Sequence, residues 1–183
     1  MSAWTPCPFA ADSPFDVARV RALWPELHAV DAEPLPEDEA LLQGWAQFHT
    51  GLFEQAADTG LAAGIDGWSL ANRATAAHAA LVEPSEGARL ALFKRVHQQA
   101  SAQVLQRPQL ASAWYWQGYA LARYAQGIHV ARALAQGLGS QVRAALHATL
   151  ALNPRHAYAH VALGAFQAAV IDKLGPMVGA MTY

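Results

Sequence analysis

PQLASAWYWQGYALARYAQG, residues 108–127 of the chain, has a shorter counterpart in AYAHVALGAF, residues 157–166. Each stretch follows a proline at the same offset, with a glycine eight positions into the expected helix and alanine at the recurring small-residue positions. Glycine and alanine allow two helix backbones to approach closely, while larger residues fill the gaps between neighbours. The two stretches therefore predict repeated helix-turn-helix units, an arrangement typical of proteins that bind other molecules.

The composition agrees with a helical domain. The chain has 183 residues, of which 54% are hydrophobic and 14% are charged, so one domain with a buried core is expected. Alanine dominates and β-branched residues are sparse, which favours helix over sheet.

The charge is unevenly distributed along the chain. Residues 1–66 have a formal net charge of −9, and residues 67–183 have one of +7. Two interpretations remain open: the acidic start lies near the basic remainder, or the basic part forms a surface for an anionic partner. The basic groups are widely spread and include only two lysines, so nucleic acid is not an expected partner.

The chain has the features of a soluble cytoplasmic protein. Cys7 is the only cysteine, so no intramolecular disulfide is possible, which fits a reducing compartment. The first sixteen residues lack the basic start and the apolar run of a secretory signal. The longest apolar stretch, residues 161–171, is too short to span a bilayer and contains Gln167, so no membrane partner is expected.

Hydrophobic periodicity and Gly/Pro breaks predict seven or eight helices and no strand. A short helix is expected from Ser13-Pro14 to about Trp24, where Pro25 stops it. An insertion of about residues 126–138 lies inside the third helix pair. The expected divisions are an irregular N-terminal segment with one short helix (1–36), a helical repeat domain (37–175, with pairs at about 37–64, 67–107 and 111–153 and an unpaired helix at 156–173) and a frayed tail (176–183).

The offsets of small and large residues resemble the tetratricopeptide repeat. Gly44 would stand at a close helix crossing with Ala46 behind it, and Gly118 with Ala120 repeats this arrangement, as Leu163-Gly164 does again. The long first helix of the third pair and its insertion resemble a divergent bacterial branch of this superfamily. That branch includes the TPR-like proteins associated with tripartite (TRAP) transporters and the regulator-of-microtubule-dynamics group. The resemblance implies an all-α superhelical array of antiparallel helix pairs.

This resemblance also implies a concave groove lined by the first helix of each pair. A groove of aromatic residues with a histidine and an arginine suits a peptide with apolar anchors and a carboxylate that Arg123 would bind. We therefore expect a non-catalytic module that binds a peptide or partner protein. In the alternative, residues 1–36 fill the groove, because their aromatic residues must be buried somewhere. The implied groove residues are Leu41, Trp45, Phe48, His49, Tyr115, Tyr119, Ala122, Arg123, Tyr158 and Val161.

Two other classes of function stay open beside this expectation. Aromatic and alanine side chains can also line a closed pocket for a small molecule or lipid. An enzyme would need a cluster of His or Arg that the spacing does not reveal, so no catalytic residue and no cofactor are predicted. His156 and His160 stand four apart on a helix, but no Glu, Asp or Cys lies nearby in sequence, so no metal site is predicted.

The last helix has no second helix to pair with. Leu163, Phe166, Val170 and Ile171 would then lack a partner, and such an apolar face must be covered. We expect self-association through this end of the chain. The alternatives are that the tail folds back, or that sequence beyond this chain covers the face.

Overall fold

The computed structural model describes residues 4–10 and 14–174, in which every regular element is helical. The expected frayed tail, residues 176–183, lies outside the described residues. For the part described, the prediction of an all-α chain without strands is confirmed. The elements are α1 (Val17–Leu27), α2 (Glu39–Thr50), α3 (Phe53–Ala62), the 3-10 turn η1 (Gly64–Gly67), α4 (Trp68–Leu81), α5 (Glu86–Gln106), α6 (Ala111–Gln126), α7 (Val130–Ala135), α8 (Leu138–Leu152) and α9 (Ala157–Leu174).

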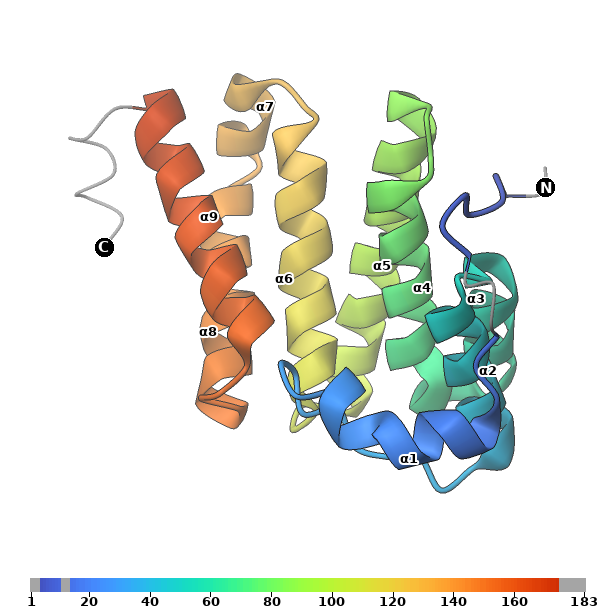
Figure 1. Ribbon diagram of the computed structural model, residues 1–183. Helices are drawn as coiled ribbons and strands as arrows, with labels where there is room; N and C mark the ends of the chain where they lie inside the picture. The colour runs from blue at the N-terminus through green and yellow to red at the C-terminus, as the bar shows by residue number, and fades with distance from the viewer. Residues whose placement is uncertain (1–3, 11–13, 175–183) are drawn as a thin grey trace.

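The longer helices stand side by side in a row, and each packs on its neighbours in the chain (Figure 1). One end of the row is formed by α2 and α3 and the other by α8 and α9, with α4, α5 and α6 between them. Helix α1 crosses the row at one end, from α2 towards the start of α6 (Figure 1). The loop after α1 is therefore carried across to the middle of the row.

The first helix differs from the prediction at both ends. It begins at Val17, because Asp16 caps it by accepting a hydrogen bond from the backbone N–H of Arg19 at 2.7 Å. The expected cap, Ser13, lies outside the described residues. The helix also continues past Pro25 to Leu27, so the prediction that this proline stops the helix was wrong.

The described residues contain nine α-helices where seven or eight were expected, because the insertion forms the short helix α7. Helix α6 ends at Gln126, where a Cβ atom on the following Gly127 would lie 2.3 Å from Cδ2 of Leu90. His129 then starts α7 by accepting a hydrogen bond from the backbone N–H of Ala131. Close packing against α5 and a new cap thus separate the two helices.

Two of the glycines that the sequence places at helix crossings do stand at close contacts. A Cβ atom on Gly44 would lie 2.5 Å from Cδ2 of Leu70 in α4 and 2.9 Å from Cγ2 of Thr59 in α3. One on Gly118 would lie 3.1 Å from Cβ of Ala145 in α8. These contacts confirm the packing role of both glycines. Gly164 in α9 differs, because a Cβ atom there would meet nothing within 4 Å in the part of the chain that the structure describes.

The aromatic residues of the N-terminal segment are buried only in part. Trp24 lies in the core, edge-on to Trp45 with their ring centroids 5.4 Å apart. Trp4 stacks on the ring of His78, with centroids 4.4 Å apart. Phe9 remains 79% exposed, contrary to the expectation that all these aromatic residues need burial.

Candidate functional site

Arg73 is the charged residue at the centre of the molecule. It belongs to α4, which is buried along most of its length because it stands in the middle of the row. Its guanidinium forms an ion pair with the carboxylate of Asp31, and both side chains are buried. Nη1 of Arg73 also lies 3.5 Å from Nδ1 of His28.

The loop between α1 and α2 positions Asp31. Its carboxylate lies 3.1 Å from Nδ1 of His28, and its backbone carbonyl accepts a hydrogen bond of 2.9 Å from the side chain of Asn153. The backbone N–H of Ala157, at the start of α9, donates to the carbonyl of Val30 at 2.8 Å. The loop therefore ties α4 in the middle of the row to the turn before α9.

Aromatic rings from two helices, α2 and α9, lie around the Arg73 guanidinium. Its Cζ lies 5.5 Å from the ring centroid of Trp45 and 5.2 Å from that of Phe48, both in α2. On the other side it lies 5.9 Å from the ring of Tyr158 in α9. Such distances allow cation–π attraction. We call Arg73, Asp31, His28, Trp45, Phe48 and Tyr158 the Arg73 cluster.

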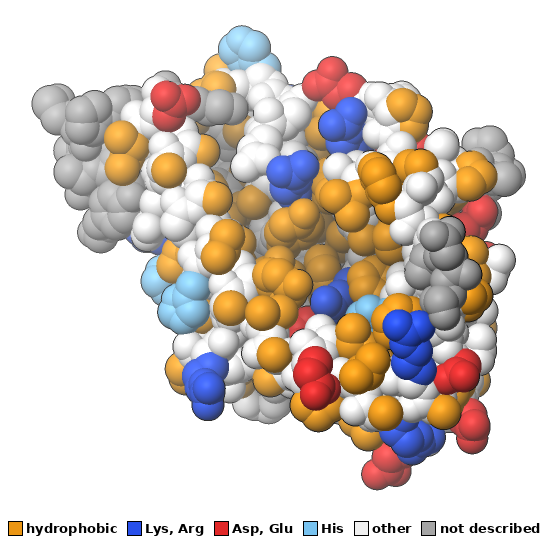
Figure 2. All heavy atoms as spheres, in the orientation of Figure 1, with side chains coloured by type: hydrophobic (Ala, Val, Ile, Leu, Met, Phe, Trp, Pro, Cys, Tyr) orange, Lys and Arg blue, Asp and Glu red, His pale blue; other side chains and the backbone are white. Residues whose placement is uncertain are grey.

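Further aromatic residues extend the Arg73 cluster along α6. The rings of Tyr115 and Tyr119 are stacked with centroids 5.7 Å apart, and Tyr115 also stacks on Tyr158 at 6.2 Å. The His156 ring lies 4.7 Å from that of Tyr115. Figure 2 shows that this face of the molecule is hollowed in its middle, where hydrophobic side chains gather around a basic and a histidine side chain. We call this region the central hollow.

A polar network lies beside the Arg73 cluster. Ser112 in α6 hydrogen-bonds to Ser69 in α4 at 3.0 Å, and its Oγ donates to the carboxyl of Glu33 at 3.4 Å. Gln103 in α5 donates from its side chain to Ser69 at 3.3 Å. Buried polar groups are tolerated when they are paired in this way, and this network fixes the relative positions of α4, α5 and α6.

Burial keeps the histidines of the site neutral at pH 7. Burial is the largest cause, and together with the nearby His28 and Arg73 it lowers the pKa of His49 to about 4. Burial is also the main cause that lowers the pKa values of His28 and His156. These rings therefore present aromatic surface rather than positive charge.

The carboxyl groups of the site are shifted in opposite directions. Burial, together with the nearby charge of Asp31, raises the pKa of Glu33 to about 7. Burial alone would raise the pKa of Asp31 as well, but the hydrogen bond from His28 and the charge of Arg73 outweigh it. The pKa of Asp31 is therefore lowered, and Arg73 faces an ionised partner. Burial raises the pKa values of Tyr115 and Tyr119, so both phenols keep their protons.

Most of the residues predicted for the groove lie together around the central hollow, at different depths. Trp45 and Tyr115 are buried, whereas Phe48, His49 and Tyr119 are half-buried. Tyr158 is 41% exposed, so part of its ring faces solvent. Ring contacts form two sets, Trp45 with Phe48 and His49 on α2, and Tyr115 with Tyr119 and Tyr158 on α6 and α9. The Arg73 guanidinium lies against a ring of each set.

The other predicted groove residues have different surroundings. Leu41 and Ala122 are buried in the core, and Val161 is 70% exposed. Arg123 is half-buried one turn beyond Tyr119, with its guanidinium 5.5 Å from the ring centroid of Phe93. Among the described residues, no ion pair joins Arg123 to an acidic group.

Sequence reasoning missed Arg73, Asp31 and His28. One signal was available, since Arg73 is the only charged residue between Trp68 and Leu81 in an Ala-rich segment. A charge in such a helix needs a partner when it is buried. The sequence does not identify Asp31 as that partner, because it lies in a loop among other acidic residues.

Part of the N-terminal segment packs on Trp45, one of the residues predicted for the groove. Trp24 and His28 stack with ring centroids 3.9 Å apart, and both lie edge-on to Trp45. Asp31, in the loop after α1, forms the ion pair with Arg73. The exposed parts of Phe48, His49, Tyr119 and Tyr158 form the open wall of the hollow.

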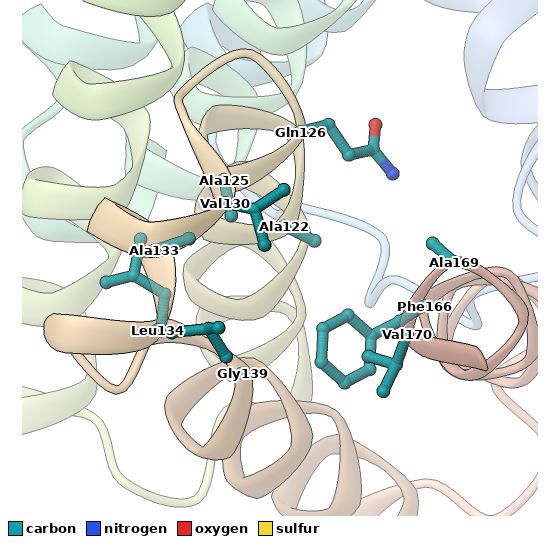
Figure 3. A pocket seen from close by; sticks show the side chains of 11 residues that line it. Ala122, Ala125, Gln126, Val130, Ala133, Leu134, Gly139, Phe166, Ala169 and Val170 are labelled. Carbon is teal, nitrogen blue, oxygen red and sulfur yellow. The ribbon is translucent and has the colours of Figure 1, made fainter. Parts of the chain in front are cut away.

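The residues predicted for self-association divide between the two sides of α9. Leu163 and Phe166 pack in part against the core formed by α6 and α8. Phe166 and Val170 point into an apolar pocket between α9 and the helices α6, α7 and α8 (Figure 3). The cavity volume of this pocket is about 100 Å³. Ile171 is 41% exposed on the outer side.

The two histidines near the start of α9 both make local hydrogen bonds there. His156 is buried, and its Nδ1 accepts a hydrogen bond from the backbone N–H of Ala159. Nε2 of His160 lies 2.9 Å from the carbonyl oxygen of Pro154. Their spacing is thus accounted for by local hydrogen bonding.

The two parts of the chain with opposite charge are joined by ion pairs. Asp31 pairs with Arg73 inside the molecule, and Asp66 pairs with Arg107 at 3.1 Å on the surface. These contacts agree with the interpretation that the acidic start lies against the basic remainder.

Within residues 4–10 and 14–174, no helix combines the length and the apolar character needed to cross a bilayer.

Comparison of the chain with protein-family models, with curated proteins and with solved structures gave no significant match.

Proposed function

We propose that the protein is a non-catalytic interaction module, a tetratricopeptide-like array whose central hollow binds a peptide segment of a partner protein. The observation that carries this proposal is the half-exposed aromatic wall of Phe48, His49, Tyr119 and Tyr158 around the Arg73 cluster. Aromatic residues held on rigid helices lose little conformational entropy on binding, so they make effective anchors for apolar side chains.

Arg123 supplies the polar contact in this proposal. It stands one turn beyond Tyr119 on the same face of α6, and it carries a charge without an acidic partner among the described residues. Among the described residues, the Arg123 side chain makes one hydrogen bond, in which its Nη1 donates to Oε1 of Gln126 at 3.4 Å. Arg73 is already neutralised by Asp31, so a carboxylate on the bound peptide would pair with Arg123 instead.

The burial of the acid–base groups favours binding over catalysis. His28 and Asp31 form a His–carboxylate pair, but they are only 2% and 8% exposed, and the His28 ring is covered by Trp24 and Trp45. A general acid or base must reach the proton that it transfers, directly or through one water. A substrate in the hollow would meet aromatic rings before it met this pair.

The apolar pocket at α9 is the weaker candidate for a ligand site. Ligand pockets usually have volumes of roughly 300–1,000 Å³. The pocket of Figure 3 has about 100 Å³, so it suits a single apolar side chain better than a small molecule or a lipid.

Selection from a phage library of random peptides tests the proposed function. We expect the enriched peptides to combine an apolar or aromatic anchor with an acidic group or a free carboxyl end. In fluorescence anisotropy titrations, Tyr119→Ala and Arg123→Glu should each weaken the binding of such a peptide by about tenfold or more. Arg132→Glu, the same charge reversal at an exposed position on α7, is the matched control and should leave the affinity unchanged.

The proposal is overturned if no peptide is enriched, or if enriched peptides bind the Tyr119 and Arg123 variants as tightly as the wild type. Circular dichroism of each variant establishes that helicity is retained. Peptides that lose affinity only with Phe166→Ala would place the binding site in the pocket at α9 and overturn the assignment to the hollow.

A further inference from the structure

Helix α9 exposes an apolar stripe on the side facing away from the core. Its inward side contains His156, Ala159, Leu163 and Phe166, which are buried or half-buried. The outward side is formed by residues that recur at alternating spacings of four and three, which places them in one line along the helix. These are Ala157, Val161, Gly164, Ala168 and Ile171, and all of them are exposed.

Gly164 lies in the middle of this stripe, and no described helix packs against it there. Gly44 and Gly118 have the same place in α2 and α6, and each is closely covered by residues of a helix that follows in the chain. No described residue lies within 4 Å of the position of the missing Cβ atom of Gly164. Between Val161 and Ile171, α9 has apolar residues on both its inward and its outward side, which is typical of a helix that is covered on both faces.

We propose that this stripe binds the same stripe of a second copy of the chain, with the two α9 helices antiparallel and crossing at Gly164. Two straight helices are closest where they cross, so the smallest residue belongs at the crossing. A twofold axis near Gly164 then places Val161 opposite the partner copy's Ala168 and Ile171 opposite the partner copy's Ala157. Each larger side chain faces a small one, as a self-complementary interface requires.

The charges at the two ends of α9 favour the antiparallel orientation. Arg155 and His160 are exposed at the start of the helix, and Asp172 is exposed near its end. The antiparallel pair brings each Asp172 towards the partner copy's Arg155, and the two helix dipoles oppose each other. A parallel pair would place like charges side by side. This interface lies outside the central hollow and does not depend on the proposed peptide binding.

Sedimentation equilibrium of the full chain over a range of concentrations tests the proposal. The mean mass should rise towards twice the chain mass of 19.6 kDa as the concentration increases. Val161→Glu places a charge in the stripe, and Gly164→Leu places a large side chain at the crossing, so both should weaken dimerisation about tenfold or more. Among the described residues, nothing lies within 4 Å of the Cβ position of Gly164, so Gly164→Leu should not disturb the packing of this part of the chain.

Leu105→Glu is the matched control for Val161→Glu, because Leu105 is an 85% exposed apolar residue on α5. This variant should dimerise like the wild type. A wild-type chain that remains monomeric at the highest concentration, or a dimer equally stable in both stripe variants, overturns the proposal. If deletion of residues 175–183 turns a monomeric chain into a dimer, the tail covers the stripe, and the proposal is also wrong.

Disulfide crosslinking tests the orientation in a Cys7→Ser background. Gly164→Cys lies next to the twofold axis and should form a crosslinked dimer under mild oxidation, because a disulfide needs Cα atoms about 4.4–6.8 Å apart. Ile171→Cys lies about 10 Å along the helix from the axis, so it should not form a disulfide with the same cysteine of the partner copy. Crosslinking of Ile171→Cys, without that of Gly164→Cys, would overturn the antiparallel arrangement.

Discussion

Arg73 and Asp31, which are 42 positions apart in the sequence, form an ion pair in the interior of the molecule. Arg73 belongs to the central helix α4, and Asp31 belongs to the loop that α1 carries across the row. Because the same loop also binds the residues just before and at the start of α9, this ion pair joins the middle of the row to its C-terminal end. The aromatic wall of the central hollow is assembled around this link.

Removing one partner of this ion pair should destabilise the fold strongly. Arg73→Met leaves the carboxylate of Asp31 buried with His28 as its remaining side-chain partner, and Asp31→Asn leaves the guanidinium uncompensated. Each change should lower the free energy of unfolding by about 3–5 kcal/mol. The double variant should lose clearly less than the sum of the two single losses, because the two residues interact directly.

Urea denaturation measures these losses, and the surface pair Asp66–Arg107 provides the control. Its side chains are 71% and 51% exposed, so Asp66→Asn should change the stability by less than about 1 kcal/mol. Additive losses for Arg73→Met and Asp31→Asn would contradict the role assigned to the central ion pair.

The stability should fall as the solution is acidified from pH 7 to pH 4. The pKa values of His28, His49, His78 and His156 are lowered in the folded protein, mainly by burial. Below about pH 6.5 the unfolded chain therefore binds more protons than the folded chain, so unfolding is favoured. Each such histidine contributes a slope of up to about 1.4 kcal/mol per pH unit.

Glu33 opposes this trend over part of the range. Its pKa is raised to about 7 in the folded state, so between about pH 4.5 and 7 the folded chain holds a proton that the unfolded chain has lost. One carboxyl group acts against four histidines, and the net stability should still decrease towards pH 4. Urea midpoints measured across this range provide the check, and His49→Gln should give a shallower slope. A stability that is constant or rises on acidification would contradict the assignment of neutral histidines.

Gly44→Ala should destabilise the packing of α2. The added Cβ atom would lie 2.5 Å from Leu70 and 2.9 Å from Thr59, so the helices must shift apart. Overpacking of this kind costs about 1–3 kcal/mol. Gly87→Ala is the control, because nothing lies within 4 Å of its Cβ position and alanine favours helix. Equal thermal stability of the two variants would show that α2 does not pack this closely.

Ala32→Gly should stabilise the protein. Ala32 has φ = 52°, the one positive φ of a non-glycine residue among those described, and it lies beside Asp31 in the loop that carries the ion pair. A side chain in this left-handed region costs roughly 1 kcal/mol, which glycine removes at the expense of some entropy in the unfolded chain. A net gain of up to about 1 kcal/mol in chemical denaturation is expected. The nearby exposed Ala29→Gly should instead lower the stability slightly, and a loss in both variants would argue against strain at Ala32.

Local sequence patterns were sufficient to predict most of the helices. Asp38 precedes α2 as its cap, Gly51 ends that helix in the left-handed conformation, and Ser85 caps α5. These signals act within a few residues, so they can be recognised without the tertiary structure. The errors at Pro25 and in the segment of α7 occurred where contacts with distant residues decide whether a helix continues.

The candidate site was predicted only in part. The aromatic residues on α2 and α6 follow from helical spacing and from the resemblance to a repeat family, and the structure places them on one face with Tyr158 of α9. The depth of each residue does not follow from spacing. Leu41 and Val161 occupy similar positions in the expected pattern, yet the first is 7% exposed and the second 70% exposed.

The amino-acid sequence alone determined the helical class, most helix limits and the close crossings at Gly44 and Gly118, because these depend on local propensity and on the size of single residues. The tertiary structure decided which charges meet, which of the residues predicted for the groove the N-terminal segment packs on, and which side of α9 stays open among the described residues. Arg73 illustrates the difference. A buried cation requires a compensating charge, but only the path of the chain across the row determines that Asp31 supplies it.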